Sequence, residues 1–330
     1  MTKKIIGAVI GMGIGQKHLE AIDGYKNAYV KTICEKNEKK IHLLKKKFPK
    51  KIVTKNENQI FSDKDINLVS IASYDNFHFS QILKGIKSGK NLIIEKPLCL
   101  NLYQLKKISN LLKKNKKIQI TSNLVLRVNS LFNEFKKKQK KEKIFYIEAD
   151  YIWGRREKLF GWRSKIKDYS VILGAGIHMI DLVMWLTELN PKSVYAIGSN
   201  KITKGTNFKK NSFVILILEF PNNILVKITA NGGATHNHFH ELKIFSTDKT
   251  LVNSNLGSYM YKNNKIIKIN SNYPDKKNRK KLIHNFIDNL KNRSAKKIIS
   301  HKEQIDLMSV CLYAEKSMKI NKKVKIKYIK

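Results

Sequence analysis

The chain has 330 residues, 42% of them hydrophobic and 9% aromatic, and a formal net charge of +41. This length and composition favour two globular domains and exclude a largely disordered chain. The three cysteines form no CxxC pair, which argues against a disulfide framework or a zinc ribbon and favours a reducing, cytoplasmic compartment. The lysines are spread over nearly every expected surface helix instead of gathering on one face with interleaved aromatic residues, so we expect no specific nucleic-acid site.

The chain opens on an apolar segment at residues 5–11 that ends in glycine. Lysines before such a segment could also mark a secretion signal. The density of glycine and the absence of a small-residue cleavage pattern before Gln16 favour a buried strand and a turn instead. The longest apolar run elsewhere, residues 213–218, is too short to cross a bilayer, so no membrane partner is expected.

Short apolar runs alternate with helical periodicity from Lys3 to Thr121, a pattern typical of β–α–β units. We expect strands at residues 5–11, 30–35, 68–73, 91–95 and 117–122. We expect helices from Gln16 onward and at residues 39–48, 78–90 and 102–115. Because these apolar runs suit a sheet that is buried on both faces, residues 1–122 are predicted to form a doubly wound parallel sheet.

After Asn123, β-rich segments follow one another without a helix between each pair, which indicates a mostly antiparallel sheet. These segments are residues 144–153, 193–199, 213–220, 224–233, 241–247 and 250–255. Helices are expected at residues 176–189, 281–293 and 303–319. We therefore predict a second, α+β domain at residues 123–330, with final helices that could pack back on the first domain.

The turn after the first strand reads Gly11-Met12-Gly13-Ile14-Gly15 and leads into a helix. Glycines there allow a tight turn and let backbone N–H groups approach a pyrophosphate at the start of the helix. With the acidic Glu35 at the end of the second strand, the pattern predicts a Rossmann-type dinucleotide site. Glu35 would bind ribose hydroxyls and repel a 2′-phosphate, which favours NAD, while Lys36 keeps NADP possible. An ordinary glycine-rich turn with a surface glutamate is the alternative.

Glu95-Lys96-Pro97 follows directly on an apolar strand. A lysine at the carboxyl end of a parallel strand faces the crevice in which open α/β sheets bind ligands, and proline stiffens its backbone. Lys96 could therefore orient a substrate hydroxyl and relay protons.

In the second half, Gly174-Ala175-Gly176 leads into an apolar helix that carries His178 and Asp181. Three residues apart, these side chains share a helix face, and the carboxylate could orient the imidazole as a general base. A structural histidine is the alternative.

Two further clusters of polar residues are candidates for binding. His236, His238 and His240 would lie on one face of a strand, but no carboxylate or cysteine cluster completes a metal site, so we expect surface or interface histidines and no metal. Arginine forks suit phosphate or carboxylate and aromatic faces suit sugar rings, which makes Trp162 and Arg163 candidate substrate-binding residues for a sugar-nucleotide or polysaccharide precursor. The nearby residues of this second cluster are Trp153, Arg155 and Arg156. Solvated loop charges are the alternative.

The order and separation of these motifs resemble the Gfo/Idh/MocA oxidoreductase family over nearly the whole chain. The likeness extends to Ser73, Asp75, Asn76, Phe77, His78, Arg127 and residues 314–317. The resemblance implies hydride transfer between a nicotinamide and a carbon of a sugar, cyclitol or related substrate, with Lys96 as catalytic lysine and His178 as general acid/base. It further implies an open sheet in the second domain and a homo-oligomer, dimer or tetramer. The implied cofactor contacts are Ser73, Asn76, His78, Glu95 and Lys96, and the implied substrate contact is Arg127.

The chain departs from the family pattern at two places. Many relatives carry an acidic residue four before the histidine, where this chain has Gly174, and Tyr74-Asp75 stands where a proline is usual. Asp181, or failing it Asp168 or Tyr169, would have to compensate. A catalytically inactive dinucleotide-binding or sensory protein of the same fold is therefore the alternative function, and a basic nucleic-acid-binding protein comes third.

Overall fold

The computed structural model describes residues 4–140, 143–270 and 273–329. The chain forms two compact units, each built around one β-sheet. The first comprises Met1–Asn123 and Lys277–Gln304, and the second comprises Leu124–Lys276 and Ile305–Lys330. The break at Asn123 lies next to the boundary expected from the sequence, and residues 277–304 join the first unit.

The first unit contains a six-stranded parallel sheet with strand order β3-β2-β1-β4-β5-β6. Its strands are β1 (Ile5–Ile10), β2 (Ala28–Cys34), β3 (Ile52–Thr54), β4 (Leu68–Ile71), β5 (Asn91–Ile94) and β6 (Ile120–Ser122). Its helices are α1 (Gly15–Asp23), α2 (Glu38–Lys47), α3 (Asn58–Ser62), α4 (Asp75–Lys87), α5 (Leu102–Lys114), α9 (Lys280–Lys291) and the 3₁₀ turn η6 (Lys277–Arg279). The doubly wound sheet predicted from the sequence is confirmed.

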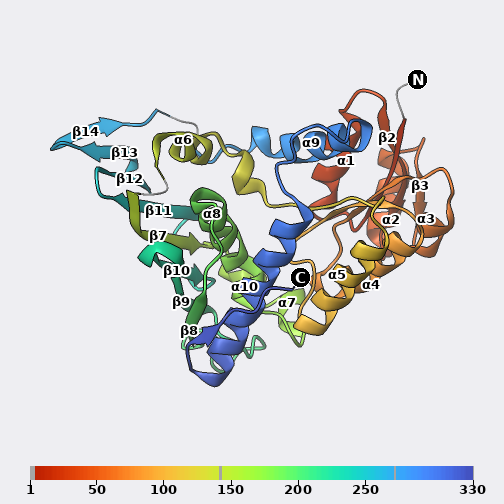
Figure 1. The fold of residues 1–330 in the computed structure, drawn as a ribbon. Coiled ribbons are helices and arrows are strands. Elements are labelled where there is room, and N and C mark those ends of the chain that lie inside the picture. The colour runs from red at the N-terminus through yellow and green to blue at the C-terminus, as the bar shows by residue number, and fades with distance from the viewer. Residues whose placement is uncertain (1–3, 141–142, 271–272, 330) are drawn as a thin grey trace. The chain divides into compact units, whose positions relative to one another are not determined.

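Strand order reverses at β1, so right-handed crossovers place α1 and α4 on opposite faces of this sheet. Helix α9 packs against α1, and α5 packs against α4 (Figure 1). Both faces are therefore covered, which is why every position of β4 is buried and why the strand sequences are apolar without alternation.

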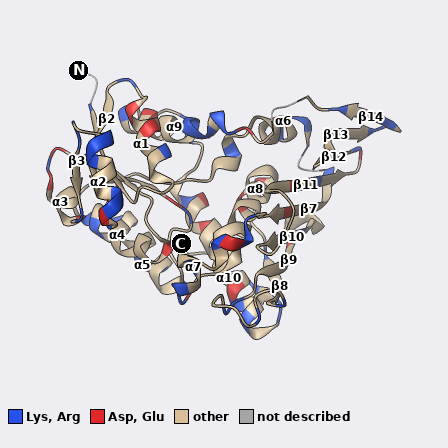
Figure 2. Cartoon of the chain, turned by 180° about the vertical axis from the view of Figure 1, so that it is seen from behind, with Lys and Arg blue, Asp and Glu red and all other residues tan. Residues whose placement is uncertain are grey.

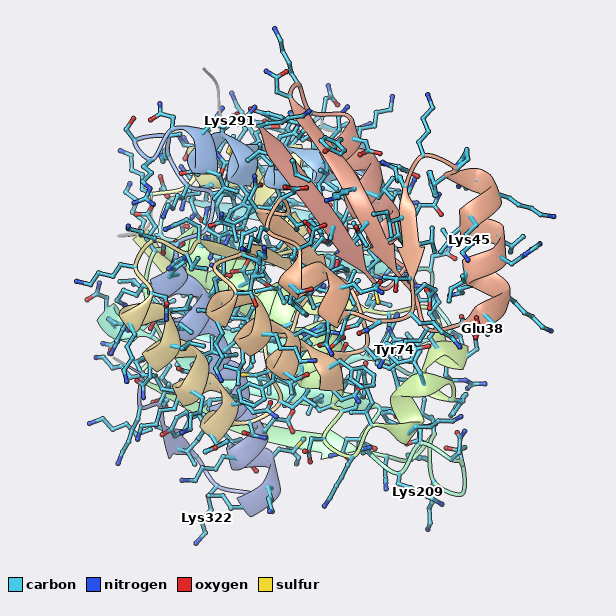
Figure 3. All side chains as sticks on the ribbon, turned by 90° about the vertical axis from the view of Figure 1, so that its right-hand side faces the viewer. Glu38, Lys45, Tyr74, Lys209, Lys291 and Lys322 are labelled. Carbon is cyan, nitrogen blue, oxygen red and sulfur yellow. The ribbon has the colours of Figure 1, made fainter. Side chains whose placement is uncertain are left out.

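Helix α2 shows how the charged helices of this unit begin and end. The Asn37 side chain accepts a hydrogen bond from the Lys40 backbone N–H, and Glu38 lies in the first turn. Three consecutive lysines, residues 45–47, occupy the last turn. Negative charge at the start and positive charge at the end both stabilise the helix dipole. Figure 3 shows Glu38 and Lys45 on this helix, among lysine side chains that extend away from the ribbon.

The second unit contains a nine-stranded sheet with order β14-β13-β12-β11-β7-β10-β9-β8-β15. Its strands are β7 (Ile144–Ile152), β8 (Ser193–Ser199), β9 (Phe213–Glu219), β10 (Leu225–Asn231), β11 (Phe239–Ser246), β12 (Lys249–Ser254), β13 (Gly257–Lys262), β14 (Lys265–Lys268) and β15 (Val324–Lys325). Strands β7 and β10 pair in parallel, and the other neighbouring pairs are antiparallel. The predicted mostly antiparallel sheet is confirmed.

The helices of this unit are α6 (Ser130–Lys138), α7 (Trp162–Lys165), α8 (Ile177–Thr187) and α10 (His301–Ile320), with residues 301–304 of α10 assigned to the first unit. Its 3₁₀ turns are η1 (Val125–Val128), η3 (Arg156–Leu159) and η5 (Pro221–Asn223). A π-helical turn, η4 (Ile172–Gly176), precedes α8 where the sequence predicted an α-helix from residue 176. Helix α8 packs on β7 and η4 packs on β10, so this segment is buried against one face of the sheet.

Basic residues lie on elements of both units. Figure 2 shows lysine and arginine on α2, α9, α10 and the β13–β14 hairpin, among other elements. In residues 4–140, 143–270 and 273–329, no helix has the length and apolar character needed to span a membrane.

Candidate functional site

The glycine motif forms the turn between β1, which ends at Ile10, and α1, which begins at Gly15. Gly11 has φ of +86°, and a Cβ there would lie 2.5 Å from the carbonyl oxygen of Ala72. A Cβ on Gly15 would lie 2.9 Å from Cγ1 of Val9. The fold itself therefore requires glycine at both ends of the turn.

Gly13, in the middle of the turn, is different. It is exposed, its φ lies outside the left-handed region, and a Cβ there would meet no atom of the described chain within 4 Å. The fold leaves space over Gly13, which is what the close approach of a pyrophosphate needs. The helix that follows presents backbone N–H groups and the positive end of its dipole. The neighbours Met12 and Ile14 are buried and exposed, respectively. The residues of this turn therefore fit a dinucleotide.

Glu35 follows β2 and lies against the same turn. Its Oε2 accepts a hydrogen bond from the Met12 backbone N–H at 3.1 Å. Its Oε1 accepts hydrogen bonds from the backbone N–H groups of Lys36 and Asn37 at 2.9 and 3.1 Å. The structure thus brings together the turn and the carboxylate that the sequence paired. A carboxylate held in this way can accept hydrogen bonds from ribose hydroxyls and repels a phosphate at the same place.

The segment at residues 73–78 lies at the start of α4, where Tyr74 is half exposed (Figure 3). The Ser73 hydroxyl donates a hydrogen bond to Gln81 Oε1 at 2.7 Å. His78 is fully buried, with Nδ1 2.7 Å from the Pro97 carbonyl oxygen and Nε2 3.1 Å from the Ser73 carbonyl oxygen. His78 therefore ties the loop after β4 to the loop after β5. Of the other residues expected at the cofactor, Asn76 is exposed.

Glu95 is the centre of a hydrogen-bonded network at the end of β5. Its Oε1 accepts a hydrogen bond from Asn123 Nδ2 at 2.6 Å and lies 3.0 Å from Nε2 of His18. Nδ1 of His18 lies 2.7 Å from the Ser70 hydroxyl. Burial raises the pKa of the Glu95 carboxyl, but the hydrogen bonds from His18 and Asn123 and the charges of His18 and Lys96 outweigh it and lower this pKa to about 2. Lys96 therefore follows directly on an ionised, largely buried carboxylate.

The sequence analysis gave His18 no role. Its signal is a polar side chain on the buried stripe of α1, beside Gly15, Leu19 and Ile22. A buried imidazole needs hydrogen-bond partners, so a histidine at such a position indicates a polar network beneath the helix.

In the second unit, His178 lies in the first turn of α8 and is 9% exposed. Its ring stacks on that of Tyr151 from β7, with centroids 5.7 Å apart and an interplanar angle of 10°. Side chains of β7 alternate between the two faces of the sheet, and Tyr151 belongs to the buried set. The imidazole is therefore held between its own helix and an aromatic face of the sheet.

Two of the three neighbouring histidines join this aromatic group. The rings of His238 and His240 lie 5.2 and 4.9 Å from that of Tyr151. Strand β11 begins only at Phe239, so His236 lies exposed in the preceding turn. The expectation that all three histidines share one strand face is therefore wrong. Within the ranges that the structure describes, no group of three or more His, Cys, Asp and Glu side chains is placed to hold a metal ion.

His240 and His238 have different neighbours at Nδ1. The Tyr273 hydroxyl accepts a hydrogen bond from the His240 backbone N–H at 3.0 Å and lies 2.5 Å from Nδ1 of His240. In His238, Nδ1 lies 3.1 and 3.2 Å from the carbonyl oxygens of Ile152 and Trp153, which can only accept, so Nδ1 carries the proton.

Asp181 lies one turn after His178, and its carboxylate binds Arg127 from η1. Nε of Arg127 donates hydrogen bonds to both carboxylate oxygens at 3.1 Å, and Nη2 donates to Oδ1 at 2.7 Å. The two side chains are 2% and 1% exposed. The structure thus pairs two residues that the sequence assigned to separate roles, one to the substrate and one to His178.

Arg163 lies within a group of aromatic rings. Its guanidinium is 4.2 Å from the ring centroid of Trp162, 5.1 Å from that of Trp153 and 5.9 Å from that of Tyr169. Burial, together with the charges of neighbouring arginines, lowers the pKa of Lys158 in the same segment. Of the predicted arginine–tryptophan cluster, the structure thus brings Arg163 together with Trp153 and Trp162.

Family models match both halves of the chain. Residues 5–123 match the Gfo/Idh/MocA model for an oxidoreductase family with an NAD-binding Rossmann fold, and residues 139–252 match the C-terminal domain of that family. Among curated proteins, the uncharacterized oxidoreductase YhhX of Escherichia coli K12 is 24% identical over 163 residues, 48% of this chain and 47% of the relative. The chain thus spans about half of that relative. The myo-inositol 2-dehydrogenase of Thermotoga maritima is 22% identical over 249 residues, 72% of each chain.

Solved structures share the fold at low identity. A myo-inositol 2-dehydrogenase from Lactobacillus plantarum superimposes with a TM-score of 0.84 at 16% identity, covering 98% of this chain and 100% of that one. The scyllo-inositol dehydrogenase from Lactobacillus casei, with bound NAD(H) and scyllo-inositol, gives 0.82 at 18% identity over 98% and 99%. The UDP-N-acetylglucosamine 3-dehydrogenase of Acidithiobacillus ferrooxidans gives 0.81 at 16% identity over 96% and 99%. With both halves matched by its models, the chain belongs to the Gfo/Idh/MocA oxidoreductase family.

Proposed function

We propose that this chain is an NAD-dependent oxidoreductase that transfers a hydride between the nicotinamide and a carbon of a sugar-like alcohol or ketone. The observation that carries the proposal is the open space over Gly13 beside the fixed carboxylate of Glu35. Membership of an oxidoreductase family supports the reaction class. The names of three relatives, which are dehydrogenases of inositols and of UDP-N-acetylglucosamine, support a polyhydroxylated substrate.

The preference for NAD follows from Glu35. Three backbone N–H groups hold its carboxylate at the turn, so it stays in place to bind the ribose hydroxyls of NAD. A 2′-phosphate would bring a second negative charge to the same place. Lys36 is adjacent, but its ammonium lies 4.6 Å from the ring centroid of Phe77, a contact that a phosphate would have to break.

Lys96 and His178 carry the proton chemistry in this proposal. When bound, the nicotinamide supplies the hydride acceptor or donor. His178 takes the proton of the substrate hydroxyl during oxidation and returns it during reduction. Lys96 donates a hydrogen bond to the substrate oxygen, and the ionised Glu95 stabilises its positive charge. The stack on Tyr151 fixes the plane of the His178 ring.

Gly13→Ala is the sharpest test of the cofactor site. The new methyl group meets no described atom within 4 Å, so we expect the same melting temperature as the wild type. It fills the space over the turn, so NADH affinity should fall by at least about tenfold, or about 1.4 kcal/mol. Quenching of nicotinamide fluorescence during titration with NADH and NADPH measures both affinities. Glu20→Gln, on the exposed side of α1, is the control and should bind NADH like the wild type.

Turnover is tested with myo-inositol, scyllo-inositol and UDP-N-acetylglucosamine by nicotinamide absorbance. His178→Ala and Lys96→Ala should each lower kcat by about 10²-fold or more, a far larger effect than any loss of NADH affinity. Failure of the wild type to bind either nucleotide would sink the proposal. NADH binding without turnover of any sugar would favour the sensory alternative.

We also propose that the sheet of the second unit forms a homo-oligomer through its open face. Ile197 on β8 and Ile217 on β9 lie on the face opposite His178 and are 48% and 39% exposed. Apolar side chains grouped on an open sheet favour contact with another chain. Light scattering after size exclusion should give a dimer or tetramer, and Ile217→Lys should shift it towards the monomer.

A further inference from the structure

The segment that leads from β7 towards η4 and α8 is strongly basic. Its residues 155–168 include six basic and two acidic residues. The 3₁₀ turn η3 lies in this segment, and the Lys158 backbone N–H donates a hydrogen bond to the Arg155 carbonyl oxygen at 3.1 Å. Because residues three apart in a 3₁₀ turn lie on the same side of it, the side chains of Arg155 and Lys158 begin next to each other.

The side chain of Arg163 returns to the same turn. Its Nη1 donates a hydrogen bond to the Lys158 carbonyl oxygen at 3.3 Å. Its guanidinium lies over the rings of Trp153 and Trp162, 5.1 and 4.2 Å from their centroids. A guanidinium placed on aromatic rings loses less freedom when it binds a ligand, because its fork is already oriented.

The three positive charges act on one another. Partial burial, and then the charges of Arg155 and Arg163, lower the pKa of Lys158, and the opposing effect of Glu157 is smaller than that of either arginine. In the described part of the chain, no ion pair includes any of these three basic residues. Nε of Arg155 is buried, and no described atom accepts a hydrogen bond from it. Buried donors are normally paired, so this group of charges has the character of a site for an anion.

This cation cluster, Arg155, Lys158 and Arg163, begins at the end of β7 next to the aromatic partner of His178. Trp153 follows Tyr151 by two residues, and its backbone N–H donates a hydrogen bond to the carbonyl oxygen of residue 231 at 3.0 Å, which continues the pairing of β7 with β10. Side chains two apart along a strand share a face, and both rings are buried. Arg163 therefore lies on the side of the sheet that holds the ring on which His178 stacks.

We propose that the cation cluster binds the phosphate group of a phosphorylated sugar substrate. This inference rests on the function proposed above and narrows its substrate class. A phosphate ester carries about −1.5 to −2 charges at pH 7 and three acceptor oxygens, so it matches several cationic donors better than a carboxylate with a single charge. Lys158 is exposed, so the cluster is open to solvent and a ligand reaches it without disturbing the core.

Tryptophan fluorescence tests the site without reference to turnover, because Trp153 and Trp162 lie against Arg163. Glucose 1-phosphate should change the fluorescence saturably at constant ionic strength, and glucose at the same concentrations should not. Lys158→Gln removes one exposed charge, and the affinity for glucose 1-phosphate should fall at least about tenfold. Lys165→Gln removes an exposed charge from the same segment and is the matched control, which should bind like the wild type.

Kinetics distinguish a phosphate on the substrate from a free phosphate. The probes are glucose 1-phosphate, UDP-N-acetylglucosamine, myo-inositol and inorganic phosphate. One of the two phosphorylated sugars should give a kcat/KM at least about tenfold above that of myo-inositol, and Lys158→Gln should remove this advantage by raising KM with kcat retained. Inorganic phosphate should compete with the phosphorylated sugar. If it activates turnover of myo-inositol without such competition, the cluster binds a regulatory anion and the contact with substrate is overturned.

The remaining outcomes separate the site from the proposed function. Equal losses of affinity in Lys158→Gln and Lys165→Gln would reduce the effect to the general positive charge of the chain and overturn the site. A weaker NADH affinity in Lys158→Gln would assign the cluster to the cofactor and also overturn it. Binding of glucose 1-phosphate that depends on Lys158, without turnover of any probe, would overturn the proposed function and leave the phosphate site standing. Turnover of myo-inositol without binding of either phosphorylated sugar would do the reverse.

Discussion

Removing the carboxylate of Asp181 should destabilise the second unit severely. Arg127 and Asp181 are 2% and 1% exposed and are joined by hydrogen bonds of 2.7 and 3.1 Å. Asp181→Ala removes this carboxylate and its hydrogen bonds from the buried Arg127 guanidinium. Water cannot replace them while the unit stays folded, so the variant loses their stabilisation without compensation from solvent.

The expected magnitude follows from this burial. Breaking one partner out of a buried ion pair costs about 3–5 kcal/mol, and whole domains are stable by only about 5–15 kcal/mol. For a unit of this size, each kcal/mol lowers the melting temperature by about 2–4 °C, so Asp181→Ala should lower it by about 6–20 °C. Replacing both residues, as in Arg127→Met with Asp181→Leu, should recover most of the loss because both members of the buried ion pair are gone.

The melting temperatures of Asp181→Ala and of the double variant are measured by thermal unfolding. The control is Glu20→Gln, because Glu20 and Lys17 form an ion pair of the same 2.7 Å distance with side chains 45% and 70% exposed. That substitution should cost less than about 1 kcal/mol. If Asp181→Ala melts within 2 °C of the wild type, on the order of the control, then the burial argument is wrong.

Three further predictions concern pH and cofactor choice. Burial raises the pKa of the Glu315 carboxyl from 4.5 to about 7. The stability that this group contributes is therefore complete below pH 4.5 and is lost as the pH rises through 7. Between about pH 5 and 8, the melting temperature should fall more in the wild type than in Glu315→Gln. Burial, and then the charge of Lys297, lowers the pKa of His301 from 6.5 to about 4, and the neutral ring accepts a hydrogen bond from the Ile120 N–H at Nε2. The stability that the neutral ring contributes is therefore complete above pH 6.5 and is lost as the pH falls through 4. The melting temperature of His301→Gln should depend less on pH in this acidic range than that of the wild type. Glu35→Ser should weaken NADH binding and strengthen NADPH binding by about tenfold each in fluorescence titrations, and an unchanged ratio of affinities would contradict the role of the carboxylate.

The parts of the fold that could be predicted from the sequence are those whose burial leaves a periodic mark. Strands β4 and β5 are apolar at nearly every position because helices cover both faces of the sheet, so a single sequence shows them. The short edge strand β3, which is partly exposed, was not predicted. Strand β14 was missed because all four of its residues are exposed and two are lysines. Its signal is the turn before it, where Asn263 and Asn264 both have positive φ, as a two-residue hairpin requires.

In the candidate site, too, some contacts could be predicted from the sequence and others could not. Glu35 could be paired with the glycine turn because strand order and spacing bring the ends of β1 and β2 together in any such fold. The partner of Asp181 could not be predicted, because Arg127 is 54 positions away and either residue alone resembles a catalytic or binding group. The same holds for His240, whose Nδ1 lies 2.5 Å from the hydroxyl of Tyr273, 33 positions later.

A missing carboxylate in a sequence has two physical explanations, loss of function or occupation of its space by another side chain. The sequence offered three residues to compensate for Gly174, and burial and contacts separate them. Asp168 is exposed, and Asp181 is bound to Arg127. Tyr169 holds its hydroxyl 2.1 Å from the place of the absent Cβ, and its ring is enclosed by the core. The space at position 174 is thus taken by Tyr169, so a side chain there would have to displace an enclosed aromatic ring.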